Sequence, residues 1–186
     1  MIQVNAWREV AVAETIEVNR APVLTLWATI VAERFGYDRQ AALTLGKGVA
    51  GLNAQAKGRT LGIYKKAEPA AGGEPRKKSG LGEEFWIEVC GRPVPAKKTQ
   101  GGIRAVSGEE PLDPASVERY LRSKFGEHLD AVEEAMRSVA RSYTPEELKD
   151  TAFGIYETFR PEIATGKRGW GQKGELSLAA HRPGRS

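Results

Sequence analysis

The chain contains 186 residues, of which 40% are hydrophobic and 28% charged, and its formal net charge is +4. This composition is typical of one globular domain, and it excludes collagen-like, coiled-coil and wholly disordered chains. No apolar run reaches the roughly 18 residues that a membrane span needs, and the first residues show no signal-peptide pattern. We therefore expect a cytoplasmic protein with no membrane partner.

The N-terminal part of the chain, residues 1–66, is expected to be helical. Residues 4–18 fit either a strand or a helix, and their Ala and Glu content slightly favours the helix. Pro22 suits the first turn of the next helix, which Gly36 is expected to end. Between these two residues, apolar side chains recur at helical spacing: Val23, Leu26, Trp27, Ile30 and Val31.

Another helix is expected to follow Asp38, whose carboxylate can cap its N-terminus. This helix contains Gly46, Gly48 and Gly51, each of which costs up to about 1 kcal/mol relative to alanine in a helix interior. Three glycines in one helix indicate either that another backbone approaches closely or that the helix breaks there.

A linker loop is predicted at residues 67–82, which are rich in Pro, Gly and basic side chains. A small antiparallel meander follows, with turns at residues 91–93 and 101–102, and Pro95 indicates that its middle segment is an edge strand. The apolar pattern here has a period of two, so two sets of side chains face opposite ways: Phe85, Ile87 and Val89 in one set, and Trp86, Glu88 and Cys90 in the other.

Two further helices are expected after the meander. Asp113 and Pro114 begin a long helix near residues 114–142. Thr144 to Glu147 form a capping box that opens the second helix, and Arg160-Pro161 ends it. The long helix carries one continuous apolar stripe, formed by Val117, Leu121, Phe125, Leu129, Val132, Met136, Val139 and Tyr143.

These elements predict a mainly helical α+β fold. A two- or three-stranded antiparallel meander lies between an N-terminal helical part and a long C-terminal helix plus a capped helix. The segments are residues 1–66, the linker loop 67–82, the meander with both later helices at 83–163, and a basic Gly-rich tail at 164–186. We expect them to form one compact domain overall.

Charge is distributed unevenly along the chain. Residues 57–104 carry eleven basic and five acidic side chains, residues 105–159 carry six basic and twelve acidic, and residues 160–186 carry six basic and two acidic. Basic segments of this kind indicate a surface for nucleic acid or another polyanion. The alternative is that the acidic segment packs beside a basic one and the charges cancel.

The tail is the first candidate contact for nucleic acid. Lys167, Arg168 and Lys173 surround Trp170, with glycines between them. The GxGxxG spacing here is not a dinucleotide-binding turn, because a helix rather than a strand precedes it and only twelve residues follow. Lysine and arginine can contact phosphates, and an indole can stack on an unpaired base. Alternatively, Trp170 and Leu176 fold back onto the core.

The meander is the second candidate contact. Lys97, Lys98 and Arg104 lie on its strands, and Trp86 is nearby. Basic residues beside an exposed aromatic ring on a sheet are typical of nucleic-acid binding faces. The alternative is that the lysines protect an edge strand from aggregation.

Catalytic and metal-binding patterns are absent from the sequence, so no cofactor and no metal are expected. A single cysteine, Cys90, excludes an internal disulfide and a multi-cysteine zinc site, and its neighbours predict an inert thiol. His128 borders the apolar stripe, which favours a half-buried structural role, and His181 lies in the tail. We expect that the protein is not an enzyme, and we assign no catalytic residue.

Three functions remain open on these grounds. The favoured one is a binding protein that contacts nucleic acid or another polyanion through the basic Gly/Trp tail and the meander. The second is a structural or interaction protein that dimerises through the long amphipathic helix. The third, least favoured, is a small enzyme with a site between the Gly-containing helix and the sheet.

Overall fold

A computed structural model describes residues 15–60, 84–161 and 173–177 of the chain. Its helices are α2 (Arg20–Arg34), α3 (Arg39–Thr60), α4 (Pro114–Phe125), α5 (Leu129–Arg141) and α6 (Pro145–Phe159). Its strands are β1 (Thr15–Val18), β2 (Glu84–Val89), β3 (Arg92–Thr99), β4 (Gly102–Ser107), β5 (Glu110–Pro111) and β6 (Gly174–Ser177). These elements confirm the prediction of a mainly helical α+β fold.

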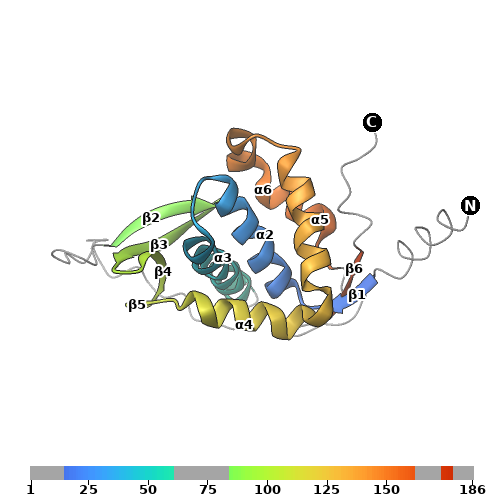
Figure 1. Cartoon of the computed structure of the whole chain (residues 1–186), viewed down its shortest axis with the longest axis horizontal. Coiled ribbons are helices and arrows are strands. Elements are labelled where there is room, and N and C mark those ends of the chain that lie inside the picture. The colour runs from blue at the N-terminus through green and yellow to red at the C-terminus, as the bar shows by residue number, and fades with distance from the viewer. Residues whose placement is uncertain (1–14, 61–83, 162–172, 178–186) are drawn as a thin grey trace, which may run out of the picture.

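Two separate antiparallel sheets lie at opposite ends of the described structure (Figure 1). Strands β2, β3, β4 and β5 form a sheet in that order, so the meander has four strands rather than the two or three expected. The second sheet pairs β1 with β6; β1 agrees with the strand alternative for residues 4–18, and β6 was not predicted. In Figure 1, helices α2 and α3 lie between the two sheets.

The β1–β6 pair joins the N-terminal part of the chain to the tail. Ile16 pairs with Leu176 and both side chains are buried, so the alternative that the tail folds back onto the core is confirmed at Leu176; Trp170 lies outside the described residues. The helix expected over 4–18 is therefore wrong at residues 15–18, while residues 4–14 lie outside the described part. The Ala and Glu content of the segment favours a helix, but a strand forms because pairing with β6 satisfies the backbone hydrogen bonds. The strand also buries its alternate side chains, Ile16 and Val18, which are β-branched.

Helix α2 is the centre of the core. From Pro22 to Ala32 every side chain is buried, and Gly36 ends the helical region with a φ of +102° that favours glycine. The Trp27 indole N–H donates to the carbonyl of Ala152 in α6 at 2.8 Å, and its ring meets Phe159 edge to face at 5.3 Å. The helix predicted after Pro22 is confirmed.

Helix α3 is continuous through its glycines. Asp38 caps it, since its carboxylate accepts from the backbone N–H of Ala41 at 2.8 Å. A Cβ at Gly46 would lie 2.9 Å from the backbone nitrogen of Thr29, and closer still to the Thr25 carbonyl oxygen. The close-approach interpretation is therefore confirmed at Gly46, where α2 packs backbone to backbone against α3.

The first hairpin of the meander turns one residue earlier than expected. Cys90 and Gly91 form its two-residue loop, with φ of +50° and +71°, and Val89 pairs with Arg92. The turn predicted at 91–93 is therefore shifted, and Cys90 leaves the strand alternation. Its thiol is buried instead of facing outward with Trp86, because the left-handed backbone redirects the side chain.

Strand β3 lies inside the sheet, between β2 and β4, so the edge position expected from Pro95 is wrong. The prolines are tolerated because β4 pairs only with the later part of β3, from Ala96 to Thr99. Pro93 and Pro95 pair with β2 alone, so neither lies between two paired strands.

The single long helix expected at 114–142 is also wrong. Helix α4 ends at Phe125, Gly126 adopts a φ of +56°, and a short 3₁₀ turn at Gly126–His128 leads into α5. Figure 1 shows that α4 and α5 run in different directions. The change of direction lets both halves contact α2, and their apolar residues enter one core: Val117, Leu121, Phe125, Leu129, Val132, Met136 and Ala140.

Helix α6 begins as its capping box predicts. The Thr144 hydroxyl accepts from the backbone N–H of Glu147 at 3.1 Å, Pro145 occupies the first helical position, and Arg160 follows the last turn.

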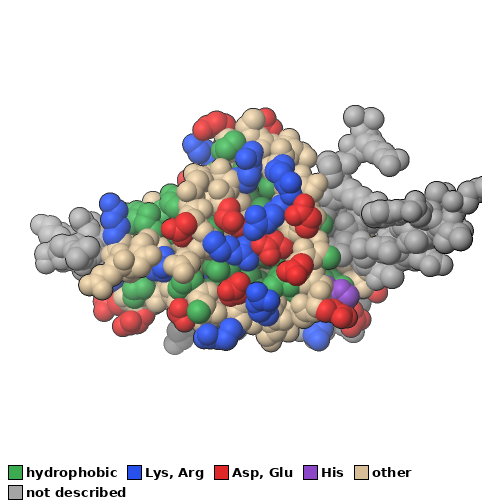
Figure 2. Space-filling model, in the orientation of Figure 1, with side chains coloured by type: hydrophobic (Ala, Val, Ile, Leu, Met, Phe, Trp, Pro, Cys, Tyr) green, Lys and Arg blue, Asp and Glu red, His purple; other side chains and the backbone are tan. Residues whose placement is uncertain are grey.

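Basic and acidic side chains alternate over the face shown in Figure 2. Arg39 of α3 contacts both Glu33 of α2 and Glu133 of α5, at 3.2 and 2.6 Å, and Arg137 contacts the same two carboxylates at 3.3 and 2.7 Å. Within the described residues the acidic segment thus pairs mainly with arginines of α3, α4 and α5 and with Lys149, and it also meets the basic segments where Arg160 contacts Glu157 at 3.7 Å and Lys97 donates to the Glu109 carbonyl.

Candidate polyanion-binding surface

The two faces of the four-stranded sheet have different environments. Helix α3 covers one face, where Gly48 packs on Val94 and the Thr44 hydroxyl accepts from the backbone N–H of Ala105 at 2.9 Å. The opposite face, which we call the outer face, carries Trp86, Lys97 and Arg104 by strand alternation. The outer face is the part of the meander where a partner can reach an aromatic ring.

Trp86 is exposed to solvent over 63% of its surface. No other large hydrophobic side chain is this exposed among the residues that the structure describes. Its cross-strand partner on the outer face is Pro95, and Glu88, two residues along β2, is also exposed and pairs with Pro93. The indole therefore lies on a paired strand, beside Pro95 and Glu88, with most of its ring open to solvent.

Lys97 and Arg104 are direct cross-strand partners, as a joint basic surface requires, but both are largely buried, at 8% and 7% exposure. The Lys97 ammonium donates to the carbonyl of Glu109 at 3.0 Å. The Arg104 guanidinium donates to the carbonyls of Ile103 and Gly101 and to the side-chain oxygen of Gln40, at 2.7 to 2.8 Å. Their charged ends are engaged within the chain: the Arg104 guanidinium joins the β3–β4 turn to α3 and lines the groove beside that helix, and the Lys97 ammonium holds the backbone just before β5.

Lys98 is exposed, and it faces the other way from Lys97 because neighbouring strand residues alternate. Its cross-strand partner is Ile103. Within the described ranges, Lys98 has neither a hydrogen-bond nor an ion-pair partner.

The tail residues and the meander residues do not meet in the described structure. Lys173 is exposed just before β6, at the opposite end of the molecule from the four-stranded sheet (Figure 1). Lys167, Arg168 and Trp170 lie outside the described residues. Lys173, the one tail candidate in the described ranges, is therefore not part of the same surface as the meander candidates.

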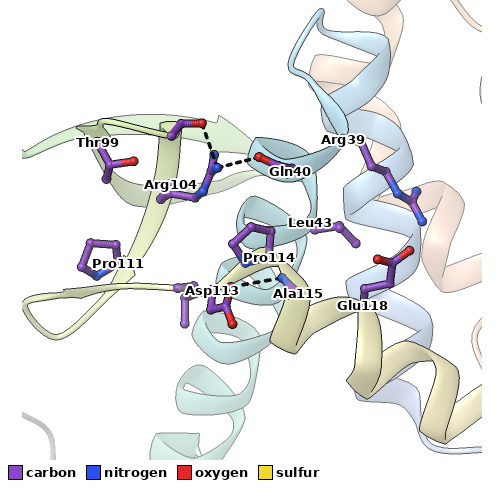
Figure 3. A pocket seen from close by; sticks show the side chains of 12 residues that line it. Arg39, Gln40, Leu43, Thr99, Arg104, Pro111, Asp113, Pro114, Ala115 and Glu118 are labelled. Atoms are coloured by element: carbon purple, nitrogen blue, oxygen red, sulfur yellow. Dashed lines mark hydrogen bonds between the residues drawn. The ribbon is translucent and has the colours of Figure 1, made fainter.

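A groove of about 770 Å³ lies between the Gly-containing helix and the sheet, where the small-enzyme hypothesis places a site (Figure 3). Its charged residues already have partners in the chain. Asp113 caps α4 through the N–H of Ala115 at 3.2 Å, Glu118 pairs with Arg122, and Arg39 pairs with two glutamates. The groove therefore offers a substrate few uncommitted charged groups.

The environment of Cys90 predicts an unreactive thiol. The side chain is only 3% exposed, and burial raises its pKa. We expect that a thiol reagent such as Ellman's reagent leaves Cys90 unmodified in the native protein at pH 8, and titrates one thiol per chain after denaturation. Rapid stoichiometric labelling under native conditions would contradict the buried position.

His128 lies in an exposed turn and is not packed along the apolar stripe, as its half-buried structural role would require. It lies in the 3₁₀ turn after α4, its side chain is 46% exposed, and its ring nitrogen is 3.8 Å from a Glu127 oxygen. The break at Gly126 turns this residue away from the apolar stripe.

From the sequence, Trp86 is predicted only as a neighbour of the basic residues on the meander and not as a site residue itself. The signal was its position opposite the apolar set Phe85, Ile87 and Val89 on β2, which predicts outward orientation but not whether another element covers it. The exposure is what makes it the leading candidate contact.

No helix in the described part of the chain is both long and apolar enough to cross a membrane. In the same ranges, no three His, Cys, Asp or Glu side chains lie together as a metal site would require. No protein-family model, curated protein or solved structure gives a significant match to the chain.

Proposed function

We propose that the protein binds nucleic acid, with Trp86 stacking on an unpaired base. The exposure of Trp86 is the observation that carries this proposal, because an indole that is 63% in water leaves most of its apolar surface without a partner. A nucleobase is a flat aromatic partner, and stacking on an aromatic side chain contributes about 1–3 kcal/mol per base.

The charges of the outer face support a modest contribution from phosphates. Lys97 and Arg104 are largely buried with their donors bonded inside the chain, Glu84 pairs with Lys97 in the strand register, and Glu88 is exposed beside Trp86. We therefore infer that stacking, rather than phosphate contact, dominates binding at this face, and that its affinity falls only gently with salt.

The basic tail is the second contact in this proposal. Lys167, Arg168 and Lys173 have no acidic residue between them, and Trp170 supplies another ring. Binding through three cations falls steeply with salt, since each phosphate contact releases a counterion. The salt dependence therefore distinguishes the tail from the sheet.

The proposal predicts that Trp86→Ala weakens binding of a labelled single-stranded oligonucleotide by about 5- to 100-fold, the range that a lost stacking interaction gives. Fluorescence anisotropy at low and moderate salt measures this, with single- and double-stranded probes compared. Trp86→Phe keeps a ring and should retain most of the affinity. The triple variant Lys167→Ala, Arg168→Ala and Trp170→Ala should lose the salt-sensitive part.

Two outcomes would contradict the proposal. If the parent protein binds neither probe at low salt, it is not a nucleic-acid-binding protein. If Trp86→Ala binds as tightly as the parent, the outer face is not the contact, and any remaining binding belongs elsewhere on the chain.

The continuous apolar stripe of a single long helix, which favoured dimerisation, is not present in the structure. The apolar stripe is divided between α4 and α5, and its main residues, Val117 to Ala140, are buried in the core of the same chain. Val139 and Tyr143, at the end of the predicted stripe, stay partly exposed, and the dimer remains an untested prediction.

A further inference from the structure

Two lysines of different helices meet at one tyrosine ring on the other side of the sheet from Trp86. The Lys47 ammonium of α3 lies 3.7 Å from the ring centroid of Tyr120 in α4, and the Lys124 ammonium lies 5.9 Å from it. Contact with the ring face holds the Lys47 ammonium in position, because a cation is attracted to the negative face of an aromatic ring.

Neither lysine has a carboxylate partner within the described ranges. Glu118 of α4 and Asp113, which caps that helix, are paired elsewhere: Asp113 contacts Arg119 at 3.9 Å and Glu118 contacts Arg122 at 3.5 Å. Glu127, just after α4, contacts His128 at 3.8 Å. Two ammonium groups therefore approach the same ring, and the described part of the chain supplies no carboxylate to either of them.

This arrangement is unfavourable in the absence of a ligand. Lys47 is half-buried, and its pKa is lowered by that burial and by repulsion from Lys124. Burial has the opposite effect on Tyr120 and raises its pKa. The phenol therefore stays neutral at physiological pH, and the ring supplies no negative charge. An anion placed between the two ammonium groups would relieve both the repulsion and the desolvation of Lys47.

We propose that Lys47 and Lys124 form a binding site for a phosphate dianion, with Tyr120 as the wall that holds Lys47. Two ammonium groups match the charge of a dianion, and a tetrahedral phosphate has enough oxygens to accept from both at once. A planar carboxylate fits less well, because it carries one charge and pairs best with a bidentate guanidinium.

The site is independent of the nucleic-acid contact proposed above. Helix α3 lies against the core face of the sheet, through Gly48 and Thr44, whereas Trp86 is on the outer face. A phosphate at Lys47 can belong to free inorganic phosphate or to a phosphoryl group of a larger ligand such as an oligonucleotide. The two sources are separable because only the second depends on Trp86.

The test is titration of the full chain with inorganic phosphate at pH 7.5, with ionic strength held constant by sodium chloride. Thermal unfolding and calorimetry follow the titration. We expect a saturable rise of the midpoint with phosphate that chloride does not produce. Lys47→Met and Lys124→Met, which keep the length of the side chain, should each weaken phosphate binding at least tenfold.

Lys149→Met is the matched control, since Lys149 is an exposed lysine on α6 that already pairs with Glu146 at 3.2 Å. It should bind phosphate as the parent does, and so should Trp86→Ala. Lys124→Glu should abolish the phosphate effect without lowering the midpoint in phosphate-free buffer, because it places a carboxylate near Lys47.

An unsaturable or absent phosphate effect in the parent would overturn the proposal, as would parent-like affinity in Lys124→Met. Lys124 is exposed, so this variant should fold even if Lys47→Met does not. Binding by an oligonucleotide that Lys124→Met weakens and Trp86→Ala does not would identify a phosphoryl group of nucleic acid as the source. Such a result supports the phosphate site while contradicting the outer-face contact.

Discussion

Replacing Gly46 with alanine should lower the free energy of unfolding by about 1–3 kcal/mol, the usual cost of overpacking a core. The new Cβ would lie 2.9 Å from the backbone nitrogen of Thr29, and its nearest neighbours include the backbone carbonyl oxygen of Thr25. Backbone atoms of a packed helix cannot rotate away, so α2 and α3 must separate. Urea or thermal unfolding followed by circular dichroism measures the change.

Gly51→Ala is the matched control in the same helix. Gly51 is exposed, and a Cβ there would meet no atom within 4 Å. The substitution should stabilise the protein by about 0.5–1 kcal/mol, because alanine loses less backbone entropy than glycine in a helix. Equal effects of the two substitutions would show that helix propensity, and not the approach of α2, determines the result.

Trp27→Ala is expected to be the most destabilising single substitution, at about 3–5 kcal/mol. The indole is fully buried between α2 and α6, and its N–H is the donor to the Ala152 carbonyl. Removing it opens a cavity beside Phe159 and leaves that carbonyl without this donor. Chemical denaturation at constant protein concentration measures the difference.

Trp86→Ala removes the same side chain from a position where it is 63% exposed, so it should change stability by no more than about 0.5 kcal/mol. A large loss of stability in this variant, or a small one in Trp27→Ala, would contradict the positions assigned to the two indoles.

Local signals predicted the elements whose boundaries are set by their own residues. The Thr144 capping box, Pro22 with the apolar repeat after it, Gly36 and the Asp38 cap all act within a few residues of their position. The structure places each of them as expected. The prediction that α3 contains a close backbone contact also holds at Gly46, because a glycine in a helix interior needs a local reason.

Features that depend on distant residues were missed. The stripe from Val117 to Ala140 keeps its helical spacing across Gly126, so spacing alone could not show the change of direction between α4 and α5. Pairing of β1 with β6 joins residues more than a hundred positions apart, and no local pattern predicts it. Pro95 indicated an edge strand because the sequence does not show that β4 pairs only beyond it.

The candidate site also contains some features that local patterns predict and others that depend on distant residues. Alternation along β2 predicted that Trp86 faces away from the core, and the structure places it there. The burial of Lys97 and Arg104 could not be predicted, since it depends on Glu109 and Gln40, which lie 12 and 64 residues away in the chain. The Lys47–Tyr120 contact likewise joins two helices that the sequence alone does not place together.

The central claim is that Trp86 stacks on an unpaired base, and tryptophan fluorescence during titration with a single-stranded oligonucleotide tests it most directly. We expect quenching of the solvent-exposed, red-shifted emission in the parent, because a stacked base quenches an indole. With Trp7 and Trp170 replaced by Phe in both proteins, this quenched component should disappear in Trp86→Phe, while the emission of the buried Trp27 persists. Unchanged quenching in Trp86→Phe, or none in the parent at concentrations where anisotropy shows binding, would contradict the claim.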